Sequence, residues 1–333
     1  MVLNQEDYGY QRWHGTLIAW GILAIPVSIN IFARKLLPAV EIIGGITHIS
    51  FFIAIVITLA VLAPRSPASF VFGTNVFGLS GWSNHGVQWC IGLLSSAFPL
   101  GGFDGVLHMS KCLGAEVRQK ANHKIGDEVK DAPRKVPLSM VYAILVNGAT
   151  ALAFMITVLF CLGDLETALT TPTGYPIIQV VYGATGSKAT TTAFVCFIIF
   201  NGLIAMFSSL ASVSRLTWAF ARDKGLPFSN VFGAVHPTLR IPLNSLILVS
   251  IIIALIQLIN IGSTSAIFAI LSMSTIGLYA SYVLPILFIA LAKMRGEKIA
   301  YGPFKLGKFG LAINIFAVVY AVSVMLLSQS HEG

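Results

Sequence analysis

An apolar run of membrane length, residues 87–110, holds the residues of this chain that could bind a small molecule. Its middle reads Pro99-Leu-Gly101-Gly102-Phe-Asp104-Gly105. Proline lacks an N–H and clashes with the carbonyl four residues before it, and glycine removes the steric preference for a helix. We therefore expect the helix to break here. Asp104 would place a carboxylate at the break, at a cost of roughly 2.5–3.5 kcal/mol on a lipid-facing helix.

Unwound backbone at membrane depth is tolerated where protein buries it or where it lines a watery cavity. A helix that breaks and carries an acid at the break is therefore typical of a substrate-binding element. The alternative is a simple kink, with Asp104 paired to a neighbouring helix, because proline and glycine are frequent in membrane helices.

The two halves of such a helix would present opposite dipoles to the gap between them. The half that ends near Phe98 directs carbonyls at the gap, and the half that begins near Phe103 directs free N–H groups. An amino acid needs both poles, one for its ammonium and one for its carboxylate. Desolvation disfavours the charged form of Asp104, which suits a group that binds and releases protons. The alternative for Asp104 is a helix cap that stays ionised.

Composition sets the class of protein. The 333 residues are 56% hydrophobic and 10% charged, against roughly 25% charged in soluble domains, and the mean hydropathy is +0.83. These values predict an all-α polytopic membrane protein. Eight spans are predicted, at residues 15–33, 42–63, 87–110, 136–161, 191–220, 243–259, 266–291 and 310–327.

The positions of the basic residues predict the orientation. Of the 21 Lys and Arg residues, all but Arg12, Arg65 and Lys188 fall in loops after odd-numbered spans or, like Arg215, at the end of such a span. By the positive-inside rule those loops face the cytoplasm and both ends of the chain lie outside. The net charge of +8 is therefore a topology signal, and nucleic-acid binding is not predicted.

Scattered polar residues add little chemistry. The four cysteines have no metal-binding spacing, so we expect free thiols, with a Cys90–Cys161 disulfide as the alternative. We predict neither a metal nor a cofactor.

His48 lies inside the second span. A hydrogen bond across helices is the ordinary role of such a histidine, and a proton relay is the alternative. No enzyme motif occurs at membrane depth.

Several motifs together resemble those of the fungal amino acid/choline/GABA permeases, members of the amino acid–polyamine–organocation superfamily. The broken helix continues as Gly105-Val-Leu-His-Met-Ser110, and a later stretch reads Asp127-Glu-Val-Lys-Asp-Ala-Pro-Arg-Lys-Val-Pro137. The fifth span ends Ser214-Arg-Leu-Thr-Trp-Ala-Phe-Ala-Arg-Asp-Lys-Gly-Leu-Pro227. Shorter matches stand at residues 160–164, 171–176 and 302–307. The resemblance covers nearly all of residues 11–327.

The resemblance implies a fold of twelve spans, with two inverted five-helix repeats and the substrate between their broken helices. This chain resembles spans four to eleven. Residues 15–63 would be the last two spans of the first repeat, 87–291 the second repeat, and 310–327 one further span. The polar segment 111–126 would be an insertion in a cytoplasmic loop. The resemblance thus suggests a chain truncated at both ends.

The resemblance also implies a secondary active transporter of amino acids or related amines, such as GABA or choline, that works by alternating access in the lipid bilayer. A truncated, non-transporting remnant is the alternative. Protons are the expected coupling ion, through Asp104 or His48. The plasma membrane is the expected location, with the vacuolar membrane as the alternative.

The resemblance also implies which residues bind the substrate: Phe98, Leu100, Gly101, Gly102, Phe103, Asp104, Gly105 and Ser212. Among them, Phe98 would be an aromatic gate. For Phe98 and Ser212, helix packing is an open alternative.

Overall fold

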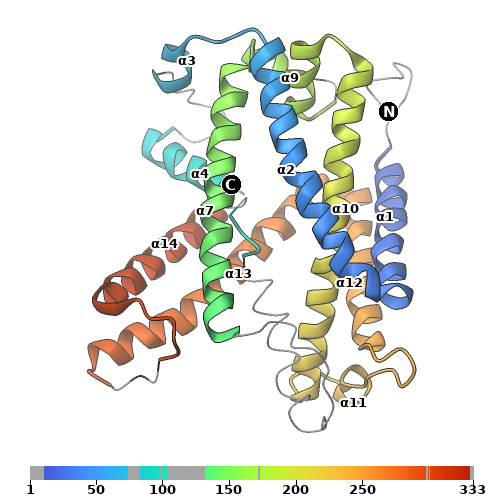
Figure 1. Ribbon diagram of the computed structural model, residues 1–333, viewed down its shortest axis with the longest axis vertical. Helices are drawn as coiled ribbons and strands as arrows, with labels where there is room; N and C mark the ends of the chain where they lie inside the picture. Colours follow the sequence, from blue (N-terminus) through green and yellow to red (C-terminus); the bar gives the residue numbers. More distant parts are fainter. Residues whose placement is uncertain are drawn as a thin grey trace. The chain divides into compact units, whose positions relative to one another are not determined.

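The computed structural model of the chain is all-helical in the part that it describes, residues 11–73, 83–97, 100–103, 132–171, 173–297, 299 and 301–330 (Figure 1). Seven of the described helices are long and apolar enough to cross a membrane. They are α1 (Arg12–Phe32), α2 (Leu37–Leu62), α7 (Ala132–Phe160), α10 (Lys188–Arg222), α12 (Leu243–Gly262), α13 (Thr264–Met294) and α14 (Gly310–Ser330). The prediction of a polytopic helical membrane protein is confirmed.

Shorter helices lie between the long ones. They are α3 (Ala68–Gly73), α4 (His85–Ala97), α8 (Leu165–Leu169), α9 (Pro176–Thr185) and α11 (Ser229–Phe232), with single 3-10 turns at Arg34–Leu36 and Gly307–Phe309. The chain divides into two compact units. The first comprises residues 1–74 and 149–262, and the second comprises residues 75–148 and 263–333.

In the first unit, α1 packs along α12 (Figure 1). The helix α10 packs against α1, α2 and α12. Arg12, Thr16 and Trp20 lie four residues apart, so they share one face of α1. Each donates a side-chain hydrogen bond to a carbonyl of α12: to Gly262 at 2.9 Å, to Gln257 at 3.2 Å and to Ala254 at 3.1 Å. Arg12 also places its positive charge at the carboxyl end of α12, where the helix dipole favours a cation.

A buried amide joins α1 to α10. The side chain of Asn30 is 6% exposed, and its Nδ2 donates to the carbonyls of Pro26 at 2.9 Å and Phe207 at 3.1 Å. Both protons of the amide are therefore satisfied away from water, as burial requires. The apolar core beside it combines residues of α1, α10 and α12, namely Val27, Ile31, Leu210, Leu246, Val249 and Ile253.

A second core of the first unit joins the end of α2 to α9 and to the residues after α7. It is centred on Leu59, Cys161 and Val181, which are 0%, 5% and 1% exposed. The Cys161 thiol donates to the Leu59 carbonyl at 3.4 Å. Among the described cysteines, Cys90, Cys161 and Cys196 are free thiols.

In the second unit, α13 and α14 pack along each other, and α4 packs against α14. At the end of α13, Lys293 Nζ lies 5.8 Å from the ring centroid of Tyr301 and 3.3 Å from the amide oxygen of Asn314. The same Asn314 amide donates to the Gly310 carbonyl at 3.0 Å. These contacts tie the turn between the two helices to the first turns of α14.

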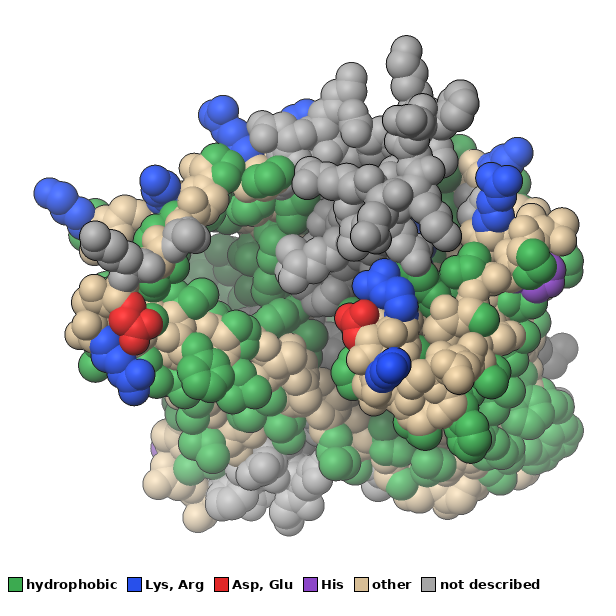
Figure 2. Space-filling model, turned by 90° about the horizontal axis from the view of Figure 1, so that it is seen from below, with side chains coloured by type: hydrophobic (Ala, Val, Ile, Leu, Met, Phe, Trp, Pro, Cys, Tyr) green, Lys and Arg blue, Asp and Glu red, His purple; other side chains and the backbone are tan. Residues whose placement is uncertain are grey.

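Large apolar side chains cover the outside of the long helices. On α2, Ile42 and Val61 are 65% and 73% exposed, and on α14 Phe316 is 73% exposed. Figure 2 shows hydrophobic side chains beside Lys and Arg side chains on the face that it presents. Apolar exposure on this scale requires a hydrocarbon environment.

Gly44 sets how closely α2 approaches α10, which gives a first prediction. A Cβ at Gly44 would lie 2.5 Å from Ile204 Cγ2, and Ile204 is β-branched and therefore stiff in a helix. We expect Gly44→Ala to lower the free energy of unfolding by about 1–3 kcal/mol. Gly45→Ala is the matched control, because nothing lies within 4 Å of its Cβ position. Unfolding by denaturant in mixed micelles measures both. Equal stabilities of the two variants would contradict the packing described.

Candidate functional site

In the predicted third span, the described residues form a helix that is followed by a turn. The helix α4 ends at Ala97, and the residues Leu100–Phe103 form a turn. With 13 residues, α4 is about 20 Å long and covers only part of the membrane thickness. Asn84 Oδ1 accepts hydrogen bonds from the N–H groups of Gly86 at 2.8 Å and Val87 at 3.3 Å, which caps its first turn.

Gly102 has a φ of +83°, which only glycine adopts without strain. Nothing lies within 4 Å of the position that its Cβ would take, so the glycine is needed for conformation and not for space. Gly101 and Gly102 are both exposed in this unit. The turn thus presents backbone with little side-chain cover, as a substrate-binding break requires.

The side chains on either side of the two glycines hold the turn in place. Leu100 Cδ2 lies 3.7 Å from the position that a Cβ added to Gly148 of α7 would take. The Phe103 ring lies 5.6 Å from the ring of Tyr282 on α13, at an interplanar angle of 32°. Both contacts lie within the second unit. The turn therefore rests on α7 and α13, while its glycine backbone stays accessible.

The other predicted site residues are dispersed. Phe98, Asp104 and Gly105 lie outside the described residues. Ser212, which is 9% exposed on α10, and His48, on an exposed face of α2, both belong to the first unit. Their roles stay predictions.

A polar contact that the sequence analysis missed lies next to His48. Thr47 Oγ1 of α2 lies 3.2 Å from Asn201 Oδ1 of α10, and Asn201 Nδ2 donates to the Phe197 carbonyl at 2.9 Å. An asparagine within the apolar stretch of α10 was the available signal, because such residues bond across helices.

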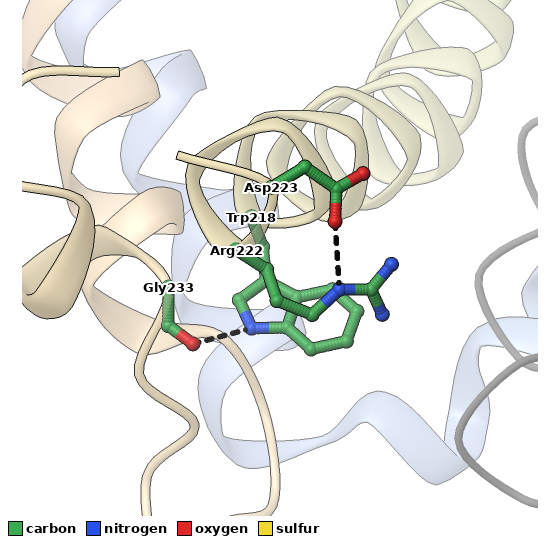
Figure 3. Close-up of polar contacts among 4 residues, drawn as sticks. All are labelled: Trp218, Arg222, Asp223 and Gly233. Atoms are coloured by element: carbon green, nitrogen blue, oxygen red, sulfur yellow. Dashed lines mark hydrogen bonds and ion pairs between the residues drawn. The ribbon is translucent and has the colours of Figure 1, made fainter. Parts of the chain in front are cut away.

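The motif at the end of α10, which contributes strongly to the resemblance, builds the end of the helix (Figure 3). Trp218 is 7% exposed, and its Nε1 donates to the Gly233 carbonyl at 2.9 Å. The Arg222 guanidinium lies 5.1 Å from the Trp218 ring centroid, and Arg222 Nε lies 3.3 Å from Asp223 Oδ1. Figure 3 shows the arginine side chain extended across the indole. These residues connect the end of α10 to the loop that follows it.

Comparison with known proteins agrees with the resemblance. The family described as "Amino acid permease" matches residues 1–330. A protein of Macrophomina phaseolina, provisionally named an amino acid/polyamine transporter, is 32% identical over 96% of this chain and 67% of its own length. The choline transporter of Saccharomyces cerevisiae is 29% identical over 98% of this chain and 55% of its own length. The GABA-specific permease of the same yeast is 27% identical over 95% and 51%. The chain thus spans about half to two-thirds of the length of these relatives.

The left-handed conformation of Gly102 gives the second prediction. Any other L-residue pays about 1–2 kcal/mol there. We expect Gly102→Ala to lower the thermal unfolding midpoint of the purified chain, measured in detergent. In Gly92→Ala, the control within α4, the added methyl group meets nothing within 4 Å and removes a helix-destabilising glycine. The control should therefore be neutral or stabilising. A Gly102→Ala variant as stable as Gly92→Ala would show that the turn does not have this conformation.

Proposed function

This chain belongs to the amino acid permease family, whose members are integral membrane transporters and not enzymes, and we propose that it moves amino acids or related small amines across a membrane by alternating access. The observation that carries the proposal is the turn at the end of α4, where two exposed glycines follow a helix that ends partway through an apolar run. Backbone of this kind at membrane depth is accommodated where it lines a cavity.

The chemistry of the turn favours a substrate with a positively charged nitrogen. The carboxyl end of α4 carries the negative pole of the helix dipole and the last free carbonyls. Amino acids, GABA, choline and polyamines all carry a cationic nitrogen, and these are the compounds that the relatives' names mention. We propose that this nitrogen binds at the end of α4, close to Gly101 and Gly102. Phe98 and Phe103 would supply aromatic surface, which attracts cations.

The remaining residues proposed for this site are Leu100, Asp104 and Gly105. For Ser212, which belongs to the first unit, contact with the substrate stays a prediction. For Asp104 the proposal is proton coupling: the carboxyl group takes up a proton from one side and releases it to the other. His48 is the second candidate for this role. Either residue would couple transport to a pH gradient, which the following experiments test.

Uptake by the purified chain in liposomes tests the proposed function. The panel should contain labelled amino acids, GABA, choline and a polyamine, each measured with and without an inward proton gradient. We expect saturable uptake of at least one compound, stimulated by the gradient. Protein-free liposomes are the control. If no compound enters above this background, transport by the 333-residue chain is refuted and the non-transporting alternative stands.

Replacing Asp104 separates proton coupling from helix capping. Asparagine caps a helix as well as aspartate but does not titrate. We expect Asp104→Asn to bind substrate and to lose the pH dependence of uptake. Asp164→Asn is the control: hydrogen bonds from the side chain and backbone of Thr167 hold the pKa of Asp164 below its usual range, so this carboxylate stays ionised throughout the assay. An unchanged pH profile in Asp104→Asn would assign the coupling to another residue.

A further inference from the structure

The second unit places an aromatic ring of α13 next to the glycine turn. The ring of Phe103, at the end of the turn, lies 5.6 Å from the ring of Tyr282, centroid to centroid, and the two ring planes differ by 32°. At this distance and tilt the rings interact and form one aromatic surface. No local pattern in the sequence shows which residue of α13 meets the turn, so Tyr282 was not among the predicted site residues.

Tyr282 turns its hydroxyl group inward. The hydroxyl oxygen is buried, whereas the residue as a whole is only half-buried. The accessible part of its side chain therefore consists of carbon atoms. Phe103 is half-buried as well, and Gly101 and Gly102 before it are exposed. Accessible aromatic carbon thus adjoins accessible backbone.

The exposed backbone indicates what this aromatic surface faces. Unwound backbone at membrane depth does not face lipid, because lipid offers no hydrogen-bond partner to its N–H and C=O groups. On the proposed function, Gly101 and Gly102 line the substrate cavity. The ring of Phe103, which follows directly in the chain, borders the same cavity, and the ring of Tyr282 extends that border onto α13.

The packing of α13 on α14 fixes the position of Tyr282. One turn before it, Tyr279 packs against Tyr320 of α14, with the ring centroids 6.3 Å apart and the planes at 65°. At the end of α13, Lys293 Nζ lies 3.3 Å from the amide oxygen of Asn314 on α14. The helix is thus held before and after residue 282. A ring carried by a helix that is held in this way is preorganised for binding.

Charged partners for a cation at the turn are scarce in the described part of the second unit. Its one described carboxylate, Glu297, lies beyond the end of α13 and pairs with Arg295 at 3.9 Å. The described groups close to the turn that attract positive charge are therefore the carbonyls at the end of α4 and the faces of the two rings.

We propose that Tyr282 is a substrate-binding residue whose ring, together with that of Phe103, binds the positively charged nitrogen of the substrate. This role rests on the proposed function, which places the nitrogen at the end of α4. Aromatic faces attract cations through the quadrupole of the ring, and more strongly where water is excluded. The alternative role of Tyr282 is to support Phe103 by packing alone. The two roles differ in whether the electron density of the ring affects binding.

A fluorinated phenylalanine at position 282 separates the two roles. Fluorine withdraws electron density from the face of the ring and changes its shape little, so it weakens cation binding and leaves packing in place. The full chain is purified in detergent, and the affinities for choline, GABA and a polyamine are measured from the rise in unfolding temperature with ligand concentration. We expect Tyr282→Phe to keep the affinity of the unsubstituted chain. Tyr282→pentafluorophenylalanine should lower it about 2–30-fold.

Tyr279 is the matched control, because it lies on the same helix and its ring contacts Tyr320 and not the turn. The same fluorinated residue should leave affinity unchanged at position 279 and should weaken binding at position 103. The Phe103 variant tests the aromatic surface even if a Tyr282 variant does not fold.

Three results would overturn the role of Tyr282 and leave the proposed function standing. They are an unchanged affinity in the fluorinated Tyr282 variant, an equal loss at position 279, and a loss of binding already in Tyr282→Phe. If none of the three compounds stabilises the unsubstituted chain, the proposed function itself fails, and the role of Tyr282 fails with it.

Discussion

Backbone polar groups in hydrocarbon must find their partners within the protein, and the rest of this structure depends on that constraint. Long helices satisfy it along most of the chain. Polar side chains within the spans also have hydrogen-bond partners in the protein: Thr16 and Trp20 donate to carbonyls of α12, and Asn30 donates to carbonyls of α1 and α10. Residues 100–103, which include two glycines, form a turn and not a helix. The exposed backbone at this point is what makes the end of α4 a candidate for substrate binding.

The same constraint explains how rigid packing and an open site coexist. In the second unit, Leu100 lies beside Gly148 of α7 and the Phe103 ring lies near the Tyr282 ring of α13, while the two glycines between them are exposed. In the first unit, α1 and α12 are joined through three side-chain hydrogen bonds to carbonyls, which fix one helix against the other. The proposed transport cycle needs such rigid helices, because alternating access moves groups of helices past a site.

Sequence reasoning was most successful where local chemistry decides the structure. Hydropathy located all seven of the spans that the structure describes. However, α10 begins at Lys188 and α13 at Thr264, before the predicted starts at residues 191 and 266, because Ser187 Oγ accepts from Thr190 N–H and Ser263 Oγ accepts from Ala266 N–H. The left-handed turn at Gly102 likewise follows from residue type. Contacts between residues that are far apart in the sequence could not be predicted in this way. The Thr47–Asn201 contact joins residues 154 positions apart, and no local pattern gives the rotation of α2 against α10 that creates it.

On the proposed mechanism, the glycine turn after α4 contacts the substrate. Protection of a cysteine at the turn tests it most directly. In Gly101→Cys, with the native cysteines replaced, the rate of alkylation in membranes is measured at increasing concentrations of choline, GABA and amino acids. We expect one of these compounds to slow alkylation in a saturable way while leaving a cysteine placed at exposed Gly92 unaffected. An alkylation rate at Gly101→Cys that no compound changes would contradict it.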